Sequence, residues 1–234
     1  MREMPTPAVK MHLLRGTMAV WILLSFVLPY VFSIGDVGFS AQWKNGKSQV
    51  SASSHPVFLV WSVIGAALFL LLMNVTTIES PAGIPSMKRR FLAFLIDFWF
   101  SLMVLTSLEG MLPLWLEGVR TGHFSWQFER DYSVPSDAFI LFPLVLSTMS
   151  LMLLYFVWPL TKGKQTVGGF ILRLRVAPPF GNRGAFTFRE AVRRIWFEFR
   201  GISPFSWLKQ GRDSLGRTWY DRETNCQVIL IKYE

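Results

Sequence analysis

Four long apolar runs constrain this chain more than any other feature of its sequence. Three carry no charge and one carries a single carboxylate, and the runs cover residues 16–34, 56–78, 91–108 and 138–160. Each is 18 to 23 residues long, and a helix of about 20 apolar residues crosses the hydrocarbon core of a bilayer. Four such runs in 234 residues leave little sequence for a soluble core. The sequence therefore predicts an all-α membrane protein with four transmembrane helices.

The first run follows Arg2, Lys10 and Arg15 and so invites comparison with a secretory signal peptide. Its 19 uncharged residues exceed the apolar segment of about 7 to 15 residues that signal peptides carry. We therefore expect a retained first helix rather than a cleaved leader.

The basic residues are distributed unevenly between the segments that separate the apolar runs. With both termini on one side of the membrane, 20 of the 24 Lys and Arg residues fall on that side. The positive-inside rule assigns it to the cytoplasm. The net charge of +9 is then explained by orientation and by attraction to anionic lipid headgroups, and we expect no nucleic-acid partner.

The sequence lacks the patterns of common catalytic and metal sites. It has one cysteine, Cys226, and three scattered histidines, so neither an internal disulfide nor metal-ligand spacing is indicated. No Ser–His–Asp, Cys–His or HExxH arrangement is present, and "GKQTVGG" at 163–169 has the wrong order for a phosphate-binding loop. We expect no enzymatic activity, no catalytic residue, no metal and no cofactor.

One charge inside an apolar run needs a reason. Asp97 lies seven residues after Arg90 in "KRRFLAFLIDFWF" (88–100), so two helical turns bring both onto nearly the same face. An ion pair between them would relieve the cost of an intramembrane charge, and Asn74 and Tyr155, at similar depth, could donate hydrogen bonds to Asp97. Asp97 either locks the helix bundle together or binds a cation or proton during transport, and the residues alone favour neither.

The part after residue 160 has a different character. Residues 171–176 alternate in polarity like a strand, and the end of the chain, 226–234, is also β-prone. We expect the two to pair in a small cytosolic sheet. Acidic residues in this tail are expected to form salt bridges at the cytosolic surface; they are Asp213, Asp221 and Glu223.

Between these strands, residues 188–200 predict an amphipathic helix. Its apolar stripe consists of Val192, Ile195, Trp196 and Phe199, opposite Arg189, Arg193 and Arg194. A basic helix with aromatic residues on its other face is typical of the plane of a membrane interface. Packing on the small sheet is the alternative, but that sheet is too small to bury two aromatic side chains.

Two further segments carry weaker signals. Residues 35–55 and 109–137 are expected to be outer loops, and 111–119 ("MLPLWLEGV") either continues the third helix or lies in the interface. Small residues in the second run, Ser62, Gly65 and Ala66, predict a close helix–helix contact within the bundle or a homodimer seam.

Several ordered motifs resemble one family. "RRFLAFLID", "GKQTVGGFILRLRV", "FREAVRR" and "RTWYDRETNCQVILI" are similar to the RDD family of bacterial membrane proteins, named for one arginine and two aspartates. By position these are Arg90, Asp97 and Asp221, and the family commonly has Gly where Arg173 stands. The resemblance covers residues 88–234 and leaves 1–87 as a separate two-span region.

The resemblance implies a multi-pass protein of the bacterial inner membrane, with both termini cytoplasmic as the charges predict. Members are described as transport proteins, some linked to cation/proton exchange. Two functions remain open: transport of a cation or small solute with Asp97 as the intramembrane polar site, or a non-enzymatic scaffold or assembly factor in which Arg90 and Asp97 only stabilise the bundle. Four spans enclose little volume, so transport implies a homo-oligomer or a membrane-protein partner.

Overall fold

The structure is a computed structural model that describes residues 7–31, 38–44, 47–75, 79–132, 141–178, 184–200, 213–214 and 216–233. The chain forms two compact units, each built from separated segments. Unit 1 comprises Met1–Ile22, Leu68–Phe100 and Leu153–Glu234, and unit 2 comprises Leu23–Ala67 and Ser101–Met152. The candidate site described below lies entirely in unit 1.

The predicted apolar runs form long helices, which are α1 (Pro7–Val31), α2 (Pro56–Asn74), α3 (Met87–Thr121) and α4 (Leu141–Thr161). Three of them contain stretches long and apolar enough to cross a membrane, namely Val9–Leu28, Pro56–Asn74 and Met87–Thr121. In α4 the stretch Leu146–Thr161 is apolar but shorter. A mostly helical chain with several helices able to span a membrane is thus confirmed, whereas the exact count of four spans stays a prediction.

α3 is longer than the third apolar run. It continues through residues 111–119 to Thr121 with Pro113 inside it, so of the two predicted alternatives for "MLPLWLEGV" the helical continuation is correct. The end of the helix is marked by Gly122, whose φ of +75° and N–H bond to the Gly118 carbonyl form a left-handed C-terminal cap.

In unit 1, one aromatic side chain from each long helix joins a shared core. The rings of Trp21 and Tyr155 lie 5.2 Å and 5.5 Å from that of Phe100, and Phe69 lies 5.1 Å from Tyr155. Tilted and stacked ring pairs at these distances add specific attraction to the burial of apolar surface. This cluster brings Tyr155 of α4 beside α3, next to the turn that carries Asp97.

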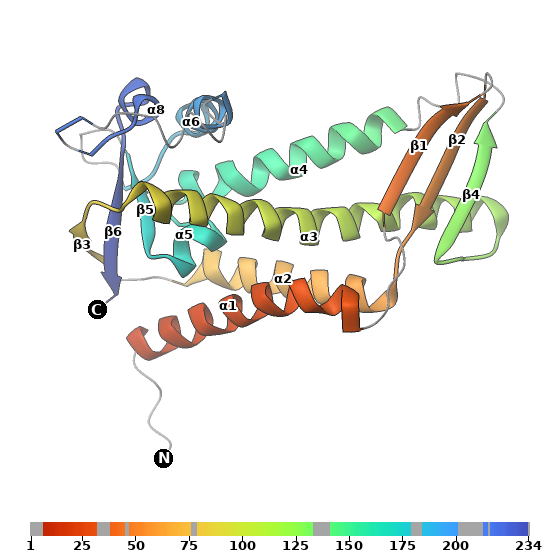
Figure 1. Cartoon of the computed structure of the whole chain (residues 1–234), viewed down its shortest axis with the longest axis horizontal. Coiled ribbons are helices and arrows are strands. Elements are labelled where there is room, and N and C mark those ends of the chain that lie inside the picture. The colour runs from red at the N-terminus through yellow and green to blue at the C-terminus, as the bar shows by residue number, and fades with distance from the viewer. Residues whose placement is uncertain are drawn as a thin grey trace, which may run out of the picture. The chain divides into compact units, whose positions relative to one another are not determined.

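The small sheet of unit 1 contains the predicted strand pair and one further strand. β5 (Leu174–Ala177) and β3 (Glu79–Gly83) both pair antiparallel with β6 (Gln227–Tyr233), in the order β3-β6-β5 (Figure 1). The predicted pairing of the two tail strands is confirmed. β3 was not predicted, because "ESPAG" contains Pro and Gly and no β-branched residue.

The segment before β5 is helical where a strand was predicted to begin. Residues Val167–Ile171 form the short helix α5, with Thr166 as its N-cap. Arg173 then adopts φ +56°, a left-handed conformation that disfavours side chains other than glycine. This position is the one at which the family resemblance implies glycine.

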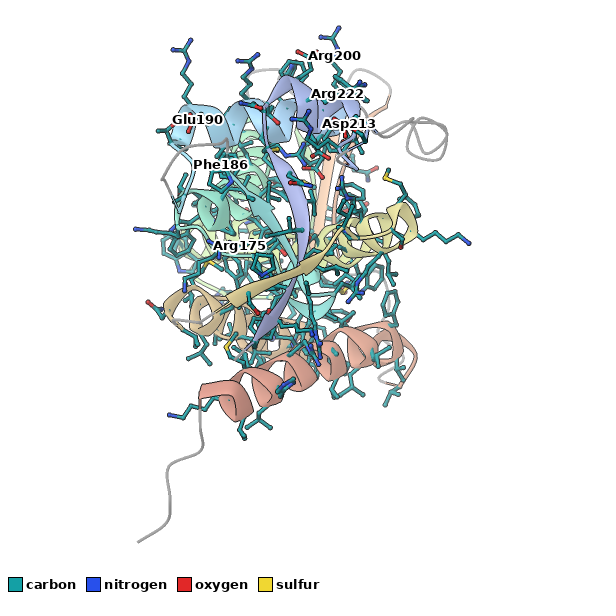
Figure 2. The ribbon with its side chains drawn as sticks, turned by 90° about the vertical axis from the view of Figure 1, so that its left-hand side faces the viewer. Arg175, Phe186, Glu190, Arg200, Asp213 and Arg222 are labelled. Carbon is teal, nitrogen blue, oxygen red and sulfur yellow. The ribbon has the colours of Figure 1, made fainter. Side chains whose placement is uncertain are left out.

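Two further helices of unit 1 lie in the described part of the tail. α6 (Phe188–Arg200) confirms the predicted amphipathic helix, and α8 (Trp219–Glu223) is a single turn with a capping box formed by Thr218 and Asp221. Figure 2 shows Arg200 of α6 and Arg222 of α8 at the outer surface of the same end of the unit.

Unit 2 contains a second sheet where outer loops were predicted. β1 (Gly38–Lys44), β2 (Lys47–Ser53) and β4 (Gln127–Tyr132) are antiparallel neighbours in that order (Figure 1). In the same unit the buried Ser62 hydroxyl bonds the Phe58 carbonyl of its own helix and lies 3.1 Å from the Met103 carbonyl oxygen of α3. Ser62 therefore serves a helix–helix contact within the bundle, one of the two roles its spacing predicted.

Candidate functional site

Asp97 lies buried on α3, and in the described part of the chain the donors that bond its carboxylate are all uncharged. The Tyr155 hydroxyl and the Gly168 N–H donate to its Oδ1 over 2.6 Å and 2.7 Å, and the Thr166 hydroxyl donates to Oδ2 over 2.6 Å. Both carboxylate oxygens are therefore bonded by groups from α4 and α5. The predicted hydrogen bond from Tyr155 is confirmed.

α5 owes its position to two residues that act on both Asp97 and their own helix. The Thr166 hydroxyl accepts the Gly169 N–H as the N-cap while donating to Asp97. There is no room for a side chain at Gly168, because a Cβ would overlap the Ala93 carbonyl oxygen and lie 3.0 Å from the Asp97 Cγ. Glycine thus allows the α5 backbone to contact α3 directly.

Arg90 does not pair with Asp97, so the predicted ion pair is wrong. The Arg90 Nη1 lies 2.6 Å from Oδ2 of Asp221, and its Nη2 donates to the carbonyl oxygens of Gly216 and Val228. Two helical turns align Arg90 and Asp97 on α3, but the folded tail supplies a closer carboxylate 131 positions away.

Asp221 is a second buried acid rather than a member of a surface salt bridge. Its Oδ1 lies 2.8 Å from Nη2 of Arg194, and its Oδ2 also accepts a hydrogen bond from the Thr218 N–H. The whole residue is buried. Burial alone would raise its pKa, but the guanidinium groups of Arg194 and Arg90 outweigh burial and hold the pKa of Asp221 below its usual value. One carboxylate thus joins α3, α6 and α8.

α6 turns a different face to the protein than its polarity pattern predicted. Ala191, Arg194 and Ile195 are its buried residues, whereas Trp196 is 66% exposed. Arg194 was expected on the polar face, but it lies over the Tyr220 ring with 4.5 Å to the centroid. Its charge is accommodated because Asp221 meets it there.

A cavity of about 90 Å³ lies between the two networks. Its polar lining includes Asp97 and Arg90 from α3, Arg194 and Glu198 from α6, and Lys164. Such a volume holds a few water molecules or a small ion. Acidic and basic groups from distant parts of the sequence therefore line one cavity.

The residues that build this site fall inside one family match. A family model described as "RDD family" matches residues 84–222, which is more than half of the chain. The chain belongs to the RDD family. No curated protein and no solved structure matches it in the corresponding comparisons.

The RDD match includes the arginine and the two aspartates for which the resemblance gave expectations. Arg90 and Asp221 contact each other, whereas Asp97 belongs to the neighbouring network. Asn74, the other predicted partner of Asp97, instead donates its side-chain amide to the Leu70 carbonyl of its own helix. The site of this RDD protein therefore consists of two networks that meet at one cavity.

Sequence reasoning missed four contributors to the RDD site, which are Thr166, Gly168, Arg194 and Glu198. The "TVGG" segment carried a usable signal, because Thr followed by a small-residue turn is typical of a helix N-terminus. Nothing local in "FREAVRRIWFEFR" distinguishes the buried Arg194 from its exposed neighbour Arg193.

Proposed function

We propose that this RDD-family chain transports a small cation or a proton across the bacterial inner membrane, with Asp97 as the ion-handling group. One observation carries the proposal: among the described residues, Asp97 meets only uncharged donors, and it lines a cavity of about 90 Å³. An intramembrane carboxylate without a cationic partner is costly and usually marks an ion pathway. A cavity of this volume fits a small ion better than a larger organic solute, whose sites usually measure about 300 Å³ or more.

The orientation proposed with this function has both termini in the cytoplasm, because 20 of 24 basic residues then face inward. Cys226 is buried and would be a poor probe of sidedness. Exposed positions serve better: His123→Cys should react with an impermeant maleimide added outside intact cells, and Arg222→Cys should not. The reverse labelling would contradict the orientation.

The exposed face of α6 supports contact with the membrane surface. Phe188 and Trp196 are 64% and 66% exposed, and Arg189, Arg193 and Arg200 are exposed on the same helix. Aromatic side chains at headgroup level beside basic residues attract an anionic bilayer. We propose this surface, rather than a nucleic acid, as the partner of the basic tail.

A scaffold or assembly role is the second candidate, and one observation favours it. Both oxygens of Asp97 are already bonded by three donors from α4 and α5, so the carboxylate could serve only to fix these elements on α3. In that case Asp97 matters for folding and not for ion movement.

Ion flux measured in proteoliposomes separates the two functions. The full-length chain is reconstituted under imposed pH, sodium or potassium gradients, and internal pH and cation content are followed by fluorescent indicators. Transport predicts flux that Asp97→Asn abolishes at unchanged protein amount and melting temperature. Asp213→Asn, which changes a carboxylate paired with Arg217, is the matched control and should retain flux. No flux from the native chain, together with a lowered melting temperature of Asp97→Asn, would favour the scaffold.

A further inference from the structure

The Arg90–Asp221–Arg194 group carries more positive than negative charge. Two guanidinium groups share one carboxylate, and the exposed fractions of the three residues are 4%, 0% and 1%. A buried charge is expensive unless a group of opposite sign compensates it. The group as a whole therefore attracts a further negative charge.

Three N–H groups of these arginines are buried without a hydrogen-bond partner in the described part of the chain. They are Nε of Arg90 and both Nε and Nη1 of Arg194. Buried donors are satisfied in the great majority of native structures, and charged donors are the most costly to leave unpaired. The two arginines are among the residues that line the cavity of about 90 Å³, and an anion in it would lie next to their buried positive charge.

We propose that this cavity binds a small monovalent anion, of about the size of chloride, between Arg90 and Arg194. Two forked guanidinium groups present fixed donors to an anion from two elements, α3 and α6. The volume admits an ion with a water or two, but not the phosphate of a lipid with its attached glycerol. The site goes beyond the proposed function, because it lies in the arginine network and its ligand has the opposite charge.

Glu198 is the internal competitor for this site. Its Oε2 lies 4.0 Å from Nη2 of Arg194, its side chain is 24% exposed, and it lines the same cavity. Burial raises the pKa of Glu198, although Arg194 opposes the shift. When Glu198 is ionised it supplies the missing negative charge, and when it is protonated the anion can do so. Binding of the anion and of a proton at Glu198 should therefore favour each other.

The other charged and titratable groups around the cavity already have partners. Asp97, which lies on α3, accepts three hydrogen bonds from α4 and α5. The Lys164 ammonium donates to the Val75 carbonyl. The Tyr220 ring stacks against Arg194, and Asp221 is shared by the two arginines. Glu198 is thus the group whose charge should respond most directly to the anion.

Anion-dependent stabilisation of the full-length chain tests the site. The protein is purified in a nonionic detergent, and its melting temperature is followed while sodium chloride replaces sodium gluconate at constant ionic strength. Gluconate is too large for the cavity, so it keeps screening constant. Chloride should raise the melting temperature saturably, because a ligand that binds only the folded state stabilises it. Equal melting temperatures in the two salts would overturn the proposal.

Two variants sharpen the result. Glu198→Gln should lower the half-saturating chloride concentration on the order of tenfold, as expected for a typical coupling between sites, and should remove its pH dependence. Glu223→Gln, an exposed acid on α8, is the control and should change neither. Arg194→Lys keeps the charge but removes the unpaired Nε and Nη1 donors, so it should abolish the chloride effect. If Arg194→Lys fails to fold, the gain in Glu198→Gln still decides.

A lipid arm identifies the source of the negative charge. Phosphatidylglycerol is added to the same detergent in gluconate. Stabilisation by this lipid that Glu198→Gln strengthens, without any effect of chloride, would assign the arginines to a headgroup and overturn the small-anion site. An unchanged half-saturating chloride concentration in the Glu198→Gln variant would also overturn the small-anion site.

Discussion

At the scale of single residues, Gly168 makes a close contact between the tail and the helix that carries Asp97. Its N–H donates to the Asp97 carboxylate over 2.7 Å, and a Cβ would overlap the Ala93 carbonyl oxygen. The Ala93 carbonyl oxygen belongs to the backbone and the Asp97 side chain is short, so neither can rotate away from an added Cβ. Relief requires movement of α5 itself.

Gly168→Ala should therefore destabilise the protein by roughly 1–3 kcal/mol or more, as other overpacked sites do. The displaced α5 would also lengthen the hydrogen bonds to Asp97. Gly184→Ala is the matched control, because nothing lies within 4 Å of a Cβ built there. Chemical unfolding in detergent measures both, and equal stability of the two variants would refute the close approach.

Asp221 gives the stability of the chain a predictable dependence on pH. Its pKa is lower in the folded protein than its usual value because Arg194 and Arg90 outweigh burial. Its contribution is present above the unfolded pKa of about 3.9 and fades as pH falls through the folded value. Asp221→Asn should cost roughly 3–5 kcal/mol at neutral pH, as loss of one partner from a buried pair does.

Stability measured from neutral pH down to acid tests this assignment. The loss from Asp221→Asn should shrink as pH falls below about 3.9, where the unfolded aspartate takes up a proton, and should vanish once pH has passed the lower pKa of the folded aspartate. Asp213→Asn breaks the partly exposed pair with Arg217 and should cost only about 0–1 kcal/mol. A loss from Asp221→Asn that stays constant down to strong acid would contradict the buried ion pair.

Depth in the apolar runs predicted two partners for Asp97, of which Tyr155 is correct and Asn74 is wrong. Tyr155 could be matched to Asp97 because both sit in apolar runs at similar depth. The partner of Arg90 could not, because helical spacing identifies neighbours along one helix and Asp221 lies 131 positions away. Arg194 looked like a solvent-facing cation because its pattern carries no sign of the carboxylate that meets it.

At the scale of elements, the connection from α5 to β5 holds a strained backbone position. Arg173 has φ +56°, and a left-handed residue with a Cβ costs roughly 1–2 kcal/mol. The nitrogen of Ile231 bonds the Arg173 carbonyl, so the conformation is fixed by the sheet.

Arg173→Gly should therefore raise the free energy of unfolding by about 0–1 kcal/mol, since relief of strain exceeds the added entropy of an unfolded glycine. Arg175→Gly, at a regular position of β5, should lower it by about 0.5–1 kcal/mol. Thermal unfolding of both variants measures the difference. A clear loss from Arg173→Gly would mean that its side chain matters more than its backbone.

α6 is an element whose aromatic residues lie in different surroundings. Phe199 packs against protein, with 5.5 Å between its ring and that of Phe156, whereas Trp196 is largely exposed. The polarity pattern predicted the helix correctly but grouped these two aromatic residues together.

Trp196→Ser should leave the melting temperature in detergent unchanged but increase trypsin cleavage after Arg193 and Arg200 in anionic liposomes, because the helix loses an interfacial anchor. Phe199→Ser should lower the melting temperature, since a packed ring is lost. Unchanged cleavage of the Trp196→Ser protein in liposomes would argue against contact of this face with the membrane.

At the scale of the whole molecule, long apolar runs were sufficient to predict the four long helices, α1 to α4. Apolar length is a strong physical signal because a bilayer demands it. The strands in both units were harder to predict, since segments such as 79–83 and 38–44 are short, polar or glycine-containing. Their pairing depends on partners far away in the sequence, as for β2 with β4.

Partners that lie far apart in the sequence also determine how the site is organised. Local spacing predicted one charged pair, Arg90 with Asp97, whereas the folded chain holds two separate networks. In one, Asp221 joins Arg90 and Arg194. In the other, among the described residues, the Asp97 carboxylate accepts hydrogen bonds from Tyr155, Thr166 and Gly168.

A mutant cycle tests that separation most directly. The free energies of unfolding of Arg90→Gln, Asp221→Asn, Asp97→Asn and the two double mutants with Arg90→Gln are measured in detergent. Contacting residues couple by roughly 0.5–3 kcal/mol, and independent ones add within about 0.3–0.5 kcal/mol. The two networks predict strong coupling of Arg90 with Asp221 and near-additivity of Arg90 with Asp97. Strong coupling of Arg90 with Asp97, and none with Asp221, would contradict the account.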